Sequence, residues 1–273
     1  MRQIIFLIIL ACGAAHAGEL KLVWSDEFDY AGLPDSSRWN YEGGFVRNRE
    51  LQYYTKGRIQ NAVVENGMLV IEAIREKFKN PQYDSAEKTE WRKSREFAEY
   101  TSASLTTQKR ASWKYGRIEV RAKLPAGRGM WPAIWMLGAN IDRVGWPACG
   151  EIDIMEYVGY NPDTIYGTVH TEKFNHVKKT QKGSKTGLQR PCEDFHLYVI
   201  EWDSRKIDFF VDDKKYFTFA NDGTGVEAWP FDWEHYLILN IAVGGSWGGA
   251  HGVDDGIFPQ RMCVDYVRVY QRK

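Results

Sequence analysis

Three carboxylates fall within six residues of an otherwise apolar segment, at Glu151, Asp153 and Glu156. In a regular β-strand side chains alternate between the two faces, so Glu151 and Asp153 share one face and Glu156 points the other way. One extra residue after Asp153 would bring all three carboxylates to the same face. We therefore expect a β-bulge near Ile154 and Met155, with Met155 displaced from regular strand pairing.

Such a one-sided cluster of acids is unfavourable because like charges repel, and it usually serves a metal or catalysis. As a metal site, the cluster would offer hard oxygen ligands to Ca²⁺ or Mg²⁺. As a glycosidase pair, one carboxylate attacks the anomeric carbon and the other protonates the leaving oxygen. A solvated edge strand is a third interpretation. The neighbours Met155, Tyr157 and Val158 disfavour it, because they are largely apolar.

The elements that must position these acids are expected to be β-strands. Residues 116–124 alternate strictly between polar and apolar side chains, which predicts a half-buried antiparallel strand. Aromatic or apolar runs that are bounded by turns predict further strands at 195–202, 206–211, 216–219, 236–243 and 263–270. The run 236–243 is apolar on both faces, so we expect it in the centre of a sheet. Many short strands with Gly-rich turns favour a sandwich or barrel in a single domain.

Composition excludes several classes of protein. The 273 residues contain 36 Lys and Arg against 36 Asp and Glu, so the formal net charge is +0. This balance argues against a nucleic-acid partner, whose phosphates require a basic surface, and against a polybasic membrane surface. The 11 Trp, 15 Tyr and 13 Phe suit a β-rich core or a surface that stacks on sugars. The charged segment 75–99 is interpreted as a solvated loop, with a rim element of a substrate cleft as the alternative.

The N-terminus predicts export. Arg2 precedes the apolar run 4–11, and residues 15–17 form an A-x-A cleavage site, so we interpret 1–17 as a signal peptide. The domain would then span 18–273 and be secreted, to the exterior or the periplasm. The segment before Cys12 also resembles a bacterial lipobox, and a lipid anchor at that cysteine is the alternative.

Three cysteines remain in the mature chain, at Cys149, Cys192 and Cys263. One disulfide with one thiol, and three buried thiols, are both compatible with this odd number. The sequence has no C-x-x-C motif and no Cys/His cluster, so we expect no structural zinc.

The acidic segment GEIDIMEYVG at 150–159 resembles the active-site strand of glycoside hydrolase family 16. Its E-x-D-x-x-E form, with the inserted residue, is typical of the laminarinase (endo-β-1,3-glucanase) branch. Other segments are similar to the family in order and spacing, over nearly the whole mature chain: WSDEF at 24–28, NRELQYYT at 48–55, YGRIE at 115–119, GMWPAIWM at 129–136, GTVH at 167–170 and VDYVRVY at 264–270.

The resemblance implies an all-β fold, a β-jelly-roll sandwich of two curved antiparallel sheets with a concave open substrate cleft. It implies that Glu151 is the nucleophile, Asp153 an auxiliary acid and Glu156 the acid/base. The reaction would be retaining hydrolysis through a glycosyl-enzyme, with no cofactor for catalysis. The family also often binds one structural Ca²⁺, for which the matching positions are the carbonyls of Glu27 and Gly67 and the side chain of Asp265. A hydrogen bond accepted by the Asp265 side chain is the plain alternative.

Five further residues are candidates for binding substrate: Asn48, Trp131, Trp135, His170 and Trp247. Trp131 and Trp135 are four apart, so on a strand they share one face, where sugar rings would stack. Core packing is the alternative for both. Trp247 lies in a Gly-rich stretch that we expect to be a loop. His170 resembles a family histidine that lines the cleft, with a structural role as the alternative.

These features predict an endo-acting hydrolase whose partner is a polysaccharide, β-1,3-glucan of the laminarin type. The alternatives are mixed-linkage β-glucan and a red-algal galactan. A sulfated galactan would require basic cleft residues, for which Arg47, Arg49 and Arg128 are available. A sugar-binding lectin is the alternative of another class, but it would require the acids to be lost. No protein partner is implied, and we expect a monomer.

Overall fold

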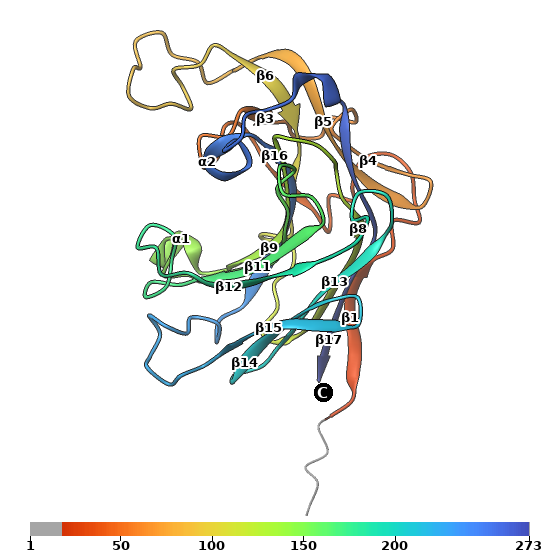
Figure 1. Ribbon diagram of the computed structural model, residues 1–273, viewed down its shortest axis with the longest axis vertical. Helices are drawn as coiled ribbons and strands as arrows, with labels where there is room; N and C mark the ends of the chain where they lie inside the picture. Colours follow the sequence, from red (N-terminus) through yellow and green to blue (C-terminus); the bar gives the residue numbers. More distant parts are fainter. Residues whose placement is uncertain (1–17, 273) are drawn as a thin grey trace, which may run out of the picture.

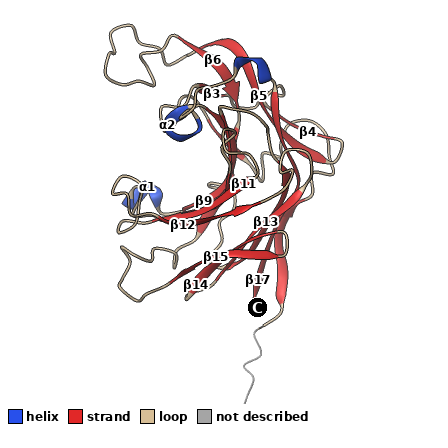
Figure 2. Cartoon of the chain, viewed as in Figure 1, coloured by secondary structure: helices blue, strands red, loops and turns tan. Residues whose placement is uncertain are grey.

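The computed structural model describes residues 18–272, where almost all regular structure is β-strand (Figure 2). The helical elements are single turns, α1 (Ile141–Val144), α2 (Gly245–Gly248) and the 3-10 helix η1 (Asp255–Ile257). Within this described range, no helix is long and apolar enough to cross a membrane. The predicted signal peptide, with its alternative anchor at Cys12, lies outside the described residues.

The strands form two sheets. The larger sheet has the strand order β15 (Lys214–Ala220), β14 (Lys206–Val211), β13 (His196–Trp202), β8 (Gly116–Lys123), β17 (Gln260–Arg272), β5 (Met68–Lys79), β6 (Phe97–Ser102) and β3 (Gln52–Tyr54). In addition, β1 (Leu20–Asp26) pairs with β17, and β4 (Ala62–Glu65) pairs with β5. The smaller sheet has the order β12 (Lys182–Gly187), β11 (Thr164–His170), β10 (Glu151–Glu156), β9 (Met130–Gly138), β16 (His235–Val243), β7 (Ser104–Thr106) and β2 (Asn40–Glu42).

This arrangement confirms the predicted all-β sandwich and most of its predicted strands. The strand β16 is buried along its whole length and lies between β9 and β7, as its two apolar faces predicted. Two details differ from expectation. The pair β3–β6 is parallel, so the sheets are not purely antiparallel. The expected loop at 75–99 is wrong at both ends, because residues 75–79 continue β5 and residues 97–99 begin β6, so the chain leaves the sheet only over 80–96.

The hydrophobic core lies between the two sheets, where β16 contacts β5 and β10 contacts β13. Alternation along β9 divides its side chains between two environments. Ile134 and Met136 are fully buried in the core, whereas Ala133 and Trp135 belong to a separate apolar cluster on the other face of the sheet. Burying one large apolar side chain contributes about 1.5–3 kcal/mol, so β9 is anchored firmly while its outer face remains available to a ligand.

The two helices α1 and α2 lie on the left side of the view in Figure 1, beside the smaller sheet. Both contribute side chains to the walls of a cavity on the outer face of that sheet. All three cysteines in the described range are free thiols, as the second interpretation expected, but only Cys149 is buried, whereas Cys192 and Cys263 are partly buried.

The core approaches β11 very closely at Gly167. A Cβ atom added there would lie 2.3 Å from Oη of Tyr216 and 3.0 Å from the ring of Phe209. The Tyr216 hydroxyl is buried and, within the described residues, has no hydrogen-bond partner. This close approach matters for function because β11 is the immediate neighbour of the acid-bearing strand β10.

We predict that Gly167→Ala lowers the free energy of unfolding by about 1–3 kcal/mol, because the added methyl group overpacks the core. Tyr216→Phe should be neutral or stabilising, since it removes a buried hydroxyl that lacks a partner. The double variant should recover part of the loss, because the nearest clashing atom is gone. Urea unfolding of the three variants measures these differences. An equal effect of Gly167→Ala in both backgrounds would contradict the packing argument.

Candidate active site

The strand β10 carries the predicted bulge. Against β9, Asp153 pairs with Trp135 and Met155 pairs with Ile134, so Ile154 is the extra residue. The prediction that Met155 is displaced from regular pairing is therefore wrong on this side of the strand. The bulge is instead centred one residue earlier, because Met155 keeps a partner and fills the core below it.

On the other side of β10, the register against β11 also shifts between Asp153 and Glu156. Ile154 and Met155 together lie opposite the single residue Gly167, so here Met155 is displaced as predicted. Both side chains are fully buried in the core. The extra residue thus turns Glu156 back to the face of the other two acids, and all three line one cavity.

This cavity has a volume of about 910 Å³ and lies on the outer face of the smaller sheet. Its floor is built from alternate side chains of β9, β10, β11 and β16. The five residues that we predicted to bind substrate all line it together with the acids: Asn48, Trp131, Trp135, His170 and Trp247. The structure therefore brings the predicted catalytic and substrate-binding residues together, while their roles stay predictions.

An indole N–H group holds each of the two glutamates. Nε1 of Trp146 donates to Oε2 of Glu151 at 2.6 Å, and Nε1 of Trp131 donates to Oε1 of Glu156 at 3.1 Å. Trp131 lies on β9, whereas Trp146 lies in the turn between α1 and β10. Trp146 also packs against His176, with ring centroids 4.9 Å apart. Sequence reasoning missed Trp146, whose only signal was its place in a Gly-Trp-Pro turn shortly before Glu151.

The two glutamates have different electrostatic surroundings. Burial raises the pKa of Glu151 to about 7, against the opposing effects of the Trp146 N–H and the Arg47 charge. Burial also raises the pKa of Glu156 to about 7, but there the charge on Glu151 adds to the increase. Because only Glu151 gains a nearby cation, we place the negative charge of the pair on Glu151 and the proton on Glu156.

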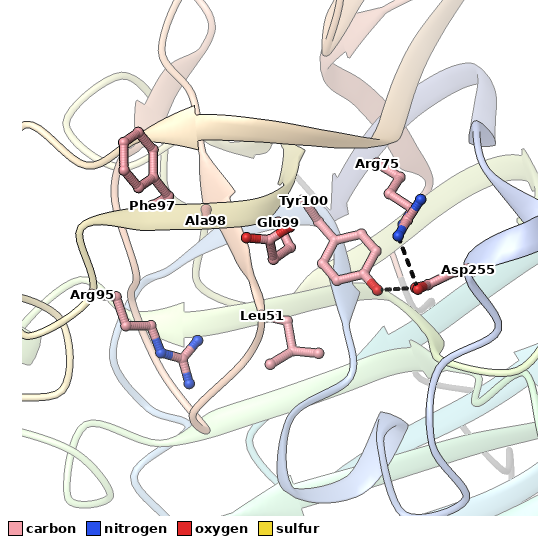
Figure 3. Close-up of a pocket in the computed structure, with 8 residues that line it drawn as sticks. All are labelled: Leu51, Arg75, Arg95, Phe97, Ala98, Glu99, Tyr100 and Asp255. Atoms are coloured by element: carbon pink, nitrogen blue, oxygen red, sulfur yellow. Dashed lines mark hydrogen bonds and ion pairs between the residues drawn. The ribbon is translucent and has the colours of Figure 1, made fainter.

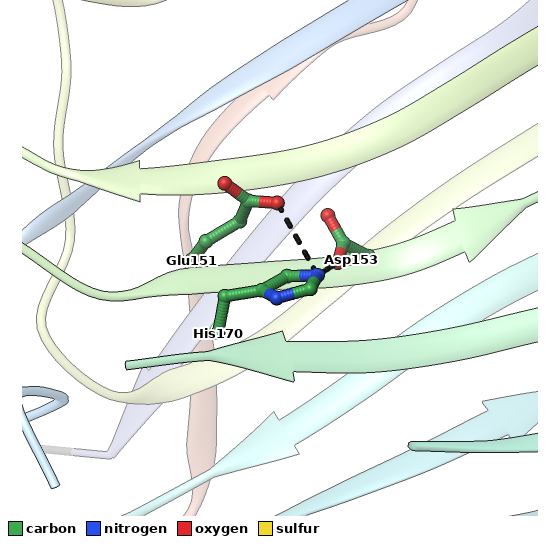
Figure 4. A group of neighbouring side chains, drawn as sticks. All are labelled: Glu151, Asp153 and His170. Carbon is green, nitrogen blue, oxygen red and sulfur yellow. Dashed lines mark ion pairs between the residues drawn. The ribbon is translucent and has the colours of Figure 1, made fainter. Parts of the chain in front are cut away.

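Asp153 and His170 complete the centre of the floor (Figure 4). Burial, and then the charge on Glu151, raise the pKa of Asp153 well above its ordinary value. His170 Nε2 lies 3.4 Å from Oδ2 of Asp153 and 3.7 Å from Oε1 of Glu151. Burial lowers the pKa of His170 to about 4, so its ring is neutral at neutral pH. A neutral imidazole adds no positive charge, so it does not lower the pKa values of the neighbouring acids.

The two tryptophans of β9 are not equivalent. The guanidinium of Arg47 lies 4.7 Å from the Trp135 ring centre and is paired with Glu42. Trp135 also donates from Nε1 to Oδ1 of Asn240 at 2.7 Å, and it is only 6% exposed. Trp135 thus packs in a cluster, as its alternative interpretation expected, and it also lines the cavity, while its stacking on sugar stays a prediction. Trp131 is the more exposed of the two.

Beyond Glu156 the cavity has an aromatic wall. The ring of Trp247 lies edge-on to Trp131 at 5.5 Å and to Tyr166 at 5.0 Å. Trp247 lies in the helical turn α2 and not in the loop that we expected. The turn places the indole in contact with Trp131 and Tyr166.

The rim of the cavity includes the loop after β5. Arg92 lines the cavity and donates from Nη2 to the carbonyl of Val46 at 2.8 Å. The alternative interpretation of the charged segment, a rim element, is therefore correct for Arg92. Asn48, on the same rim, adopts a left-handed backbone with φ of 54° and donates to Oε1 of Glu50 at 3.2 Å.

A second cavity, of about 370 Å³, lies at β6, away from the acids. Figure 3 shows its main polar contacts, in which Asp255 accepts a hydrogen bond from Tyr100 and pairs with Arg75 at 3.2 Å. Its opposite charges thus largely neutralise each other. It offers no carboxylate pair comparable to that of the larger cavity.

The predicted calcium ligands lie in one region of the larger sheet. Asp265 is the extra residue of a bulge in β17 against β8. Pairing of β17 with β5 ends two residues from Gly67, and its pairing with β1 ends next to Glu27. These oxygens suit Ca²⁺. However, Oδ2 of Asp265 accepts a hydrogen bond from Arg121 at 2.6 Å, so a cation would share that carboxylate.

The fold and the site together define a class of protein, a β-sandwich glycoside hydrolase with a cluster of acids on the floor of an open cleft. Comparison with known proteins gives the family. The model for "Glycosyl hydrolases family 16" matches residues 52–268, and the chain belongs to this family.

Similar proteins cover almost the whole chain. A "Beta-glucanase" of Rhodothermus marinus is 48% identical over 288 residues, which cover 99% of this chain and 95% of that protein. The X-ray structure of the laminarinase from Rhodothermus marinus matches with a TM-score of 0.84 at 49% identity, covering 94% and 99% of the two chains. The structure of a non-specific endo-β-1,3(4)-glucanase of the same family matches with a TM-score of 0.83 at 48% identity, covering 93% and 92%.

The two indole hydrogen bonds lead to a prediction about pH. Trp146→Phe removes a donor that stabilises the Glu151 carboxylate, so the pKa of Glu151 rises and the acidic limb of the kcat/KM profile moves to higher pH. Trp131→Phe should instead move the alkaline limb to higher pH, because Glu156 stays protonated longer. A hydrogen bond to a charged group is worth about 1.5–3 kcal/mol, so each limb should move by about one pH unit or more.

The control is Trp135→Phe, whose lost N–H served Asn240 and no carboxylate. Both limbs should keep their positions in this variant. The limbs report the apparent pKa values of the coupled pair. A shift of the same limb in Trp146→Phe and Trp131→Phe would contradict the assignment of the charge to Glu151.

Proposed function

We propose that this protein is an endo-acting β-1,3-glucanase that cleaves laminarin-type glucan with retention of anomeric configuration. The observation that carries the proposal is the pair of glutamates on the cleft floor: burial raises both pKa values to about 7, and only Glu151 has a nearby cation, Arg47. The family membership and the β-glucan-cleaving relatives support the same reaction. We propose that the enzyme acts as a monomer on a polysaccharide substrate.

In the proposed mechanism, Glu151 attacks the anomeric carbon while Glu156 transfers its proton to the departing glycosidic oxygen. This step yields a glycosyl-enzyme and leaves Glu156 as a carboxylate. Glu156 then removes a proton from water, and the resulting hydroxide releases the sugar from Glu151. The charge on Glu151 disappears when it attacks, which lowers the pKa of Glu156 at the moment when Glu156 must give up its proton. Trp146 fixes the orientation of Glu151 throughout.

The open cleft suits internal cleavage of a long chain, and its lining suits a neutral polymer. Its aromatic wall offers Trp131 and Trp247 to sugar rings. Among the described residues that line the cavity, the arginines are Arg47 and Arg92, and each is paired with a glutamate. These pairings disfavour a sulfated galactan.

Mixed-linkage β-glucan is the second candidate substrate, because one similar structure is that of a non-specific endo-β-1,3(4)-glucanase. A lectin is disfavoured because the three acids are present.

We further propose export of the domain from residue 18 and a structural Ca²⁺ near Asp265. N-terminal sequencing of the mature protein would test the export. The calcium site would be tested by chelation, which should lower the thermal stability of the wild type but not that of Asp265→Ala.

A polysaccharide panel tests the substrate. We predict the highest kcat/KM on laminarin, lower activity on lichenan, and no release of reducing ends from agarose or carrageenan. The physical reason is that the cleft combines sugar-stacking indoles with arginines whose charges are already paired. A reducing-sugar assay on the four polymers measures this order. Faster cleavage of carrageenan than of laminarin would refute the proposed substrate.

Removal of each glutamate tests the roles. Glu156→Ala should reduce turnover of laminarin by about 10²–10⁴-fold, the usual contribution of a general acid. It should affect aryl glycosides with a good leaving group much less, because they require little proton transfer. Glu151→Ala should be inactive on both substrates. NMR of the earliest product of the wild-type enzyme should show the β-anomer. An α-anomer, or equal losses on both substrates in Glu156→Ala, would overturn the assignment.

A further inference from the structure

We propose that the floor of the active site is also a binding site for a divalent transition-metal ion, Zn²⁺ in particular, and that this ion reversibly inhibits the enzyme. The site consists of Glu151, Asp153 and His170, which adjoin one another on β10 and β11 (Figure 4). Each residue offers one ligand atom, and these atoms all lie within 4.8 Å of one another. Glu156 is not a member of this set.

The distances suit a tetrahedral ion. His170 Nε2 lies 3.4 Å from Oδ2 of Asp153 and 3.7 Å from Oε1 of Glu151. Ligands bound to zinc at about 2.0–2.2 Å in a tetrahedron lie about 3.3–3.6 Å from one another. The three side chains therefore need only small movements to enclose the ion. The fourth position would face the open cleft and hold water.

A second observation points to a missing partner at this place. Asp153 is only 3% exposed, and its Oδ2 has no hydrogen-bond partner within the described part of the chain. This oxygen faces Nε2 of His170. Buried polar atoms are rarely left without a partner, and a bound cation would satisfy this one. Nδ1 of His170 can carry the ring proton, which leaves the Nε2 lone pair for the metal.

The ligand set selects the type of ion. Ca²⁺ and Mg²⁺ prefer oxygen ligands alone, whereas one imidazole with carboxylates suits Zn²⁺. Nδ1 of His170 is buried without a hydrogen-bond partner among the described residues. Resident metal sites usually support the ligating histidine by such a bond. The ion would therefore bind reversibly, as an inhibitor and not as a cofactor. It would occupy the Glu151 oxygen that attacks the sugar, so metal and substrate would exclude each other.

Equilibrium dialysis of the full-length wild-type protein against Zn²⁺ alone tests the site. We expect one ion per chain. His170→Gln and Asp153→Asn should each weaken binding by about tenfold or more, by analogy with the losses seen when metal sites are altered. Glu156→Gln should bind as wild type does. His176→Gln is the matched control, because this second histidine lines the same cavity but does not belong to the set. Thermal melting confirms that each variant is folded.

Equal Zn²⁺ binding by wild type, His170→Gln and Asp153→Asn would overturn the site, as would loss of binding in His176→Gln alone.

Inhibition rests on the proposed function and is measured separately, from initial rates on laminarin. Zn²⁺ should raise the apparent KM without lowering kcat, and Mg²⁺ at the same concentration should not. Inhibition that lowers kcat alone would overturn the competitive mechanism. A protein that binds Zn²⁺ at this site but cleaves none of the four polymers would refute the proposed function and leave the metal site standing.

Discussion

Three carboxylates share one floor, where Asp153 is buried and Glu151 and Glu156 are partly buried, and most other features of the site follow from this one constraint. A buried charge without a partner destabilises a protein by several kcal/mol, so the acids can share the floor only if protons and donors compensate them. The pKa values of Glu151, Asp153 and Glu156 are raised chiefly because these side chains are buried. The same burial places the apparent pKa values of the glutamate pair near neutrality, where one proton can be held and transferred.

The fold distinguishes the two glutamates through elements that are distant in sequence. The strand β9 supplies the indole donor for Glu156, and the turn after α1 supplies the donor for Glu151. Arg47, from the segment between β2 and β3, adds its charge near Glu151. Two chemically identical side chains thereby acquire different surroundings, and the nearby cation favours the negative charge on Glu151 over Glu156.

The strand pattern and the spacing of the acids were enough to predict the sandwich and the bulge of β10. Alternation alone showed that Glu156 would otherwise point into the core. It did not distinguish Ile154 from Met155 as the extra residue, because both are apolar and both fill the core. The family resemblance, and not periodicity, gave the roles of the acids.

Other features required contacts that no local pattern encodes. The bond from Trp146 to Glu151 depends on the conformation of a turn, and the arginine that covers Trp135 comes from another part of the chain. The parallel pair β3–β6 likewise depends on the path of a long connection. Residues 75–79 were assigned to a loop because their charges suggested solvent, but one face of an antiparallel sheet can be solvated as well, as the alternating exposure of these residues shows.

The electrostatics of the cleft also bear on which molecules it admits. Arg47 lies beside the floor, yet its charge is shared with Glu42 and its plane covers Trp135, so it acts within the protein more than toward a ligand. The ionised Glu151 then leaves the floor negative. An anionic polymer would meet repulsion there without a compensating unpaired cation among the described residues lining the cavity, whereas a neutral glucan meets hydrogen-bonding groups and indole faces. The same negative floor, with the neutral imidazole of His170 beside it, favours a small cation. The proposed selection of neutral sugars and the proposed susceptibility to metal ions would thus have a single origin in the charge distribution of the floor.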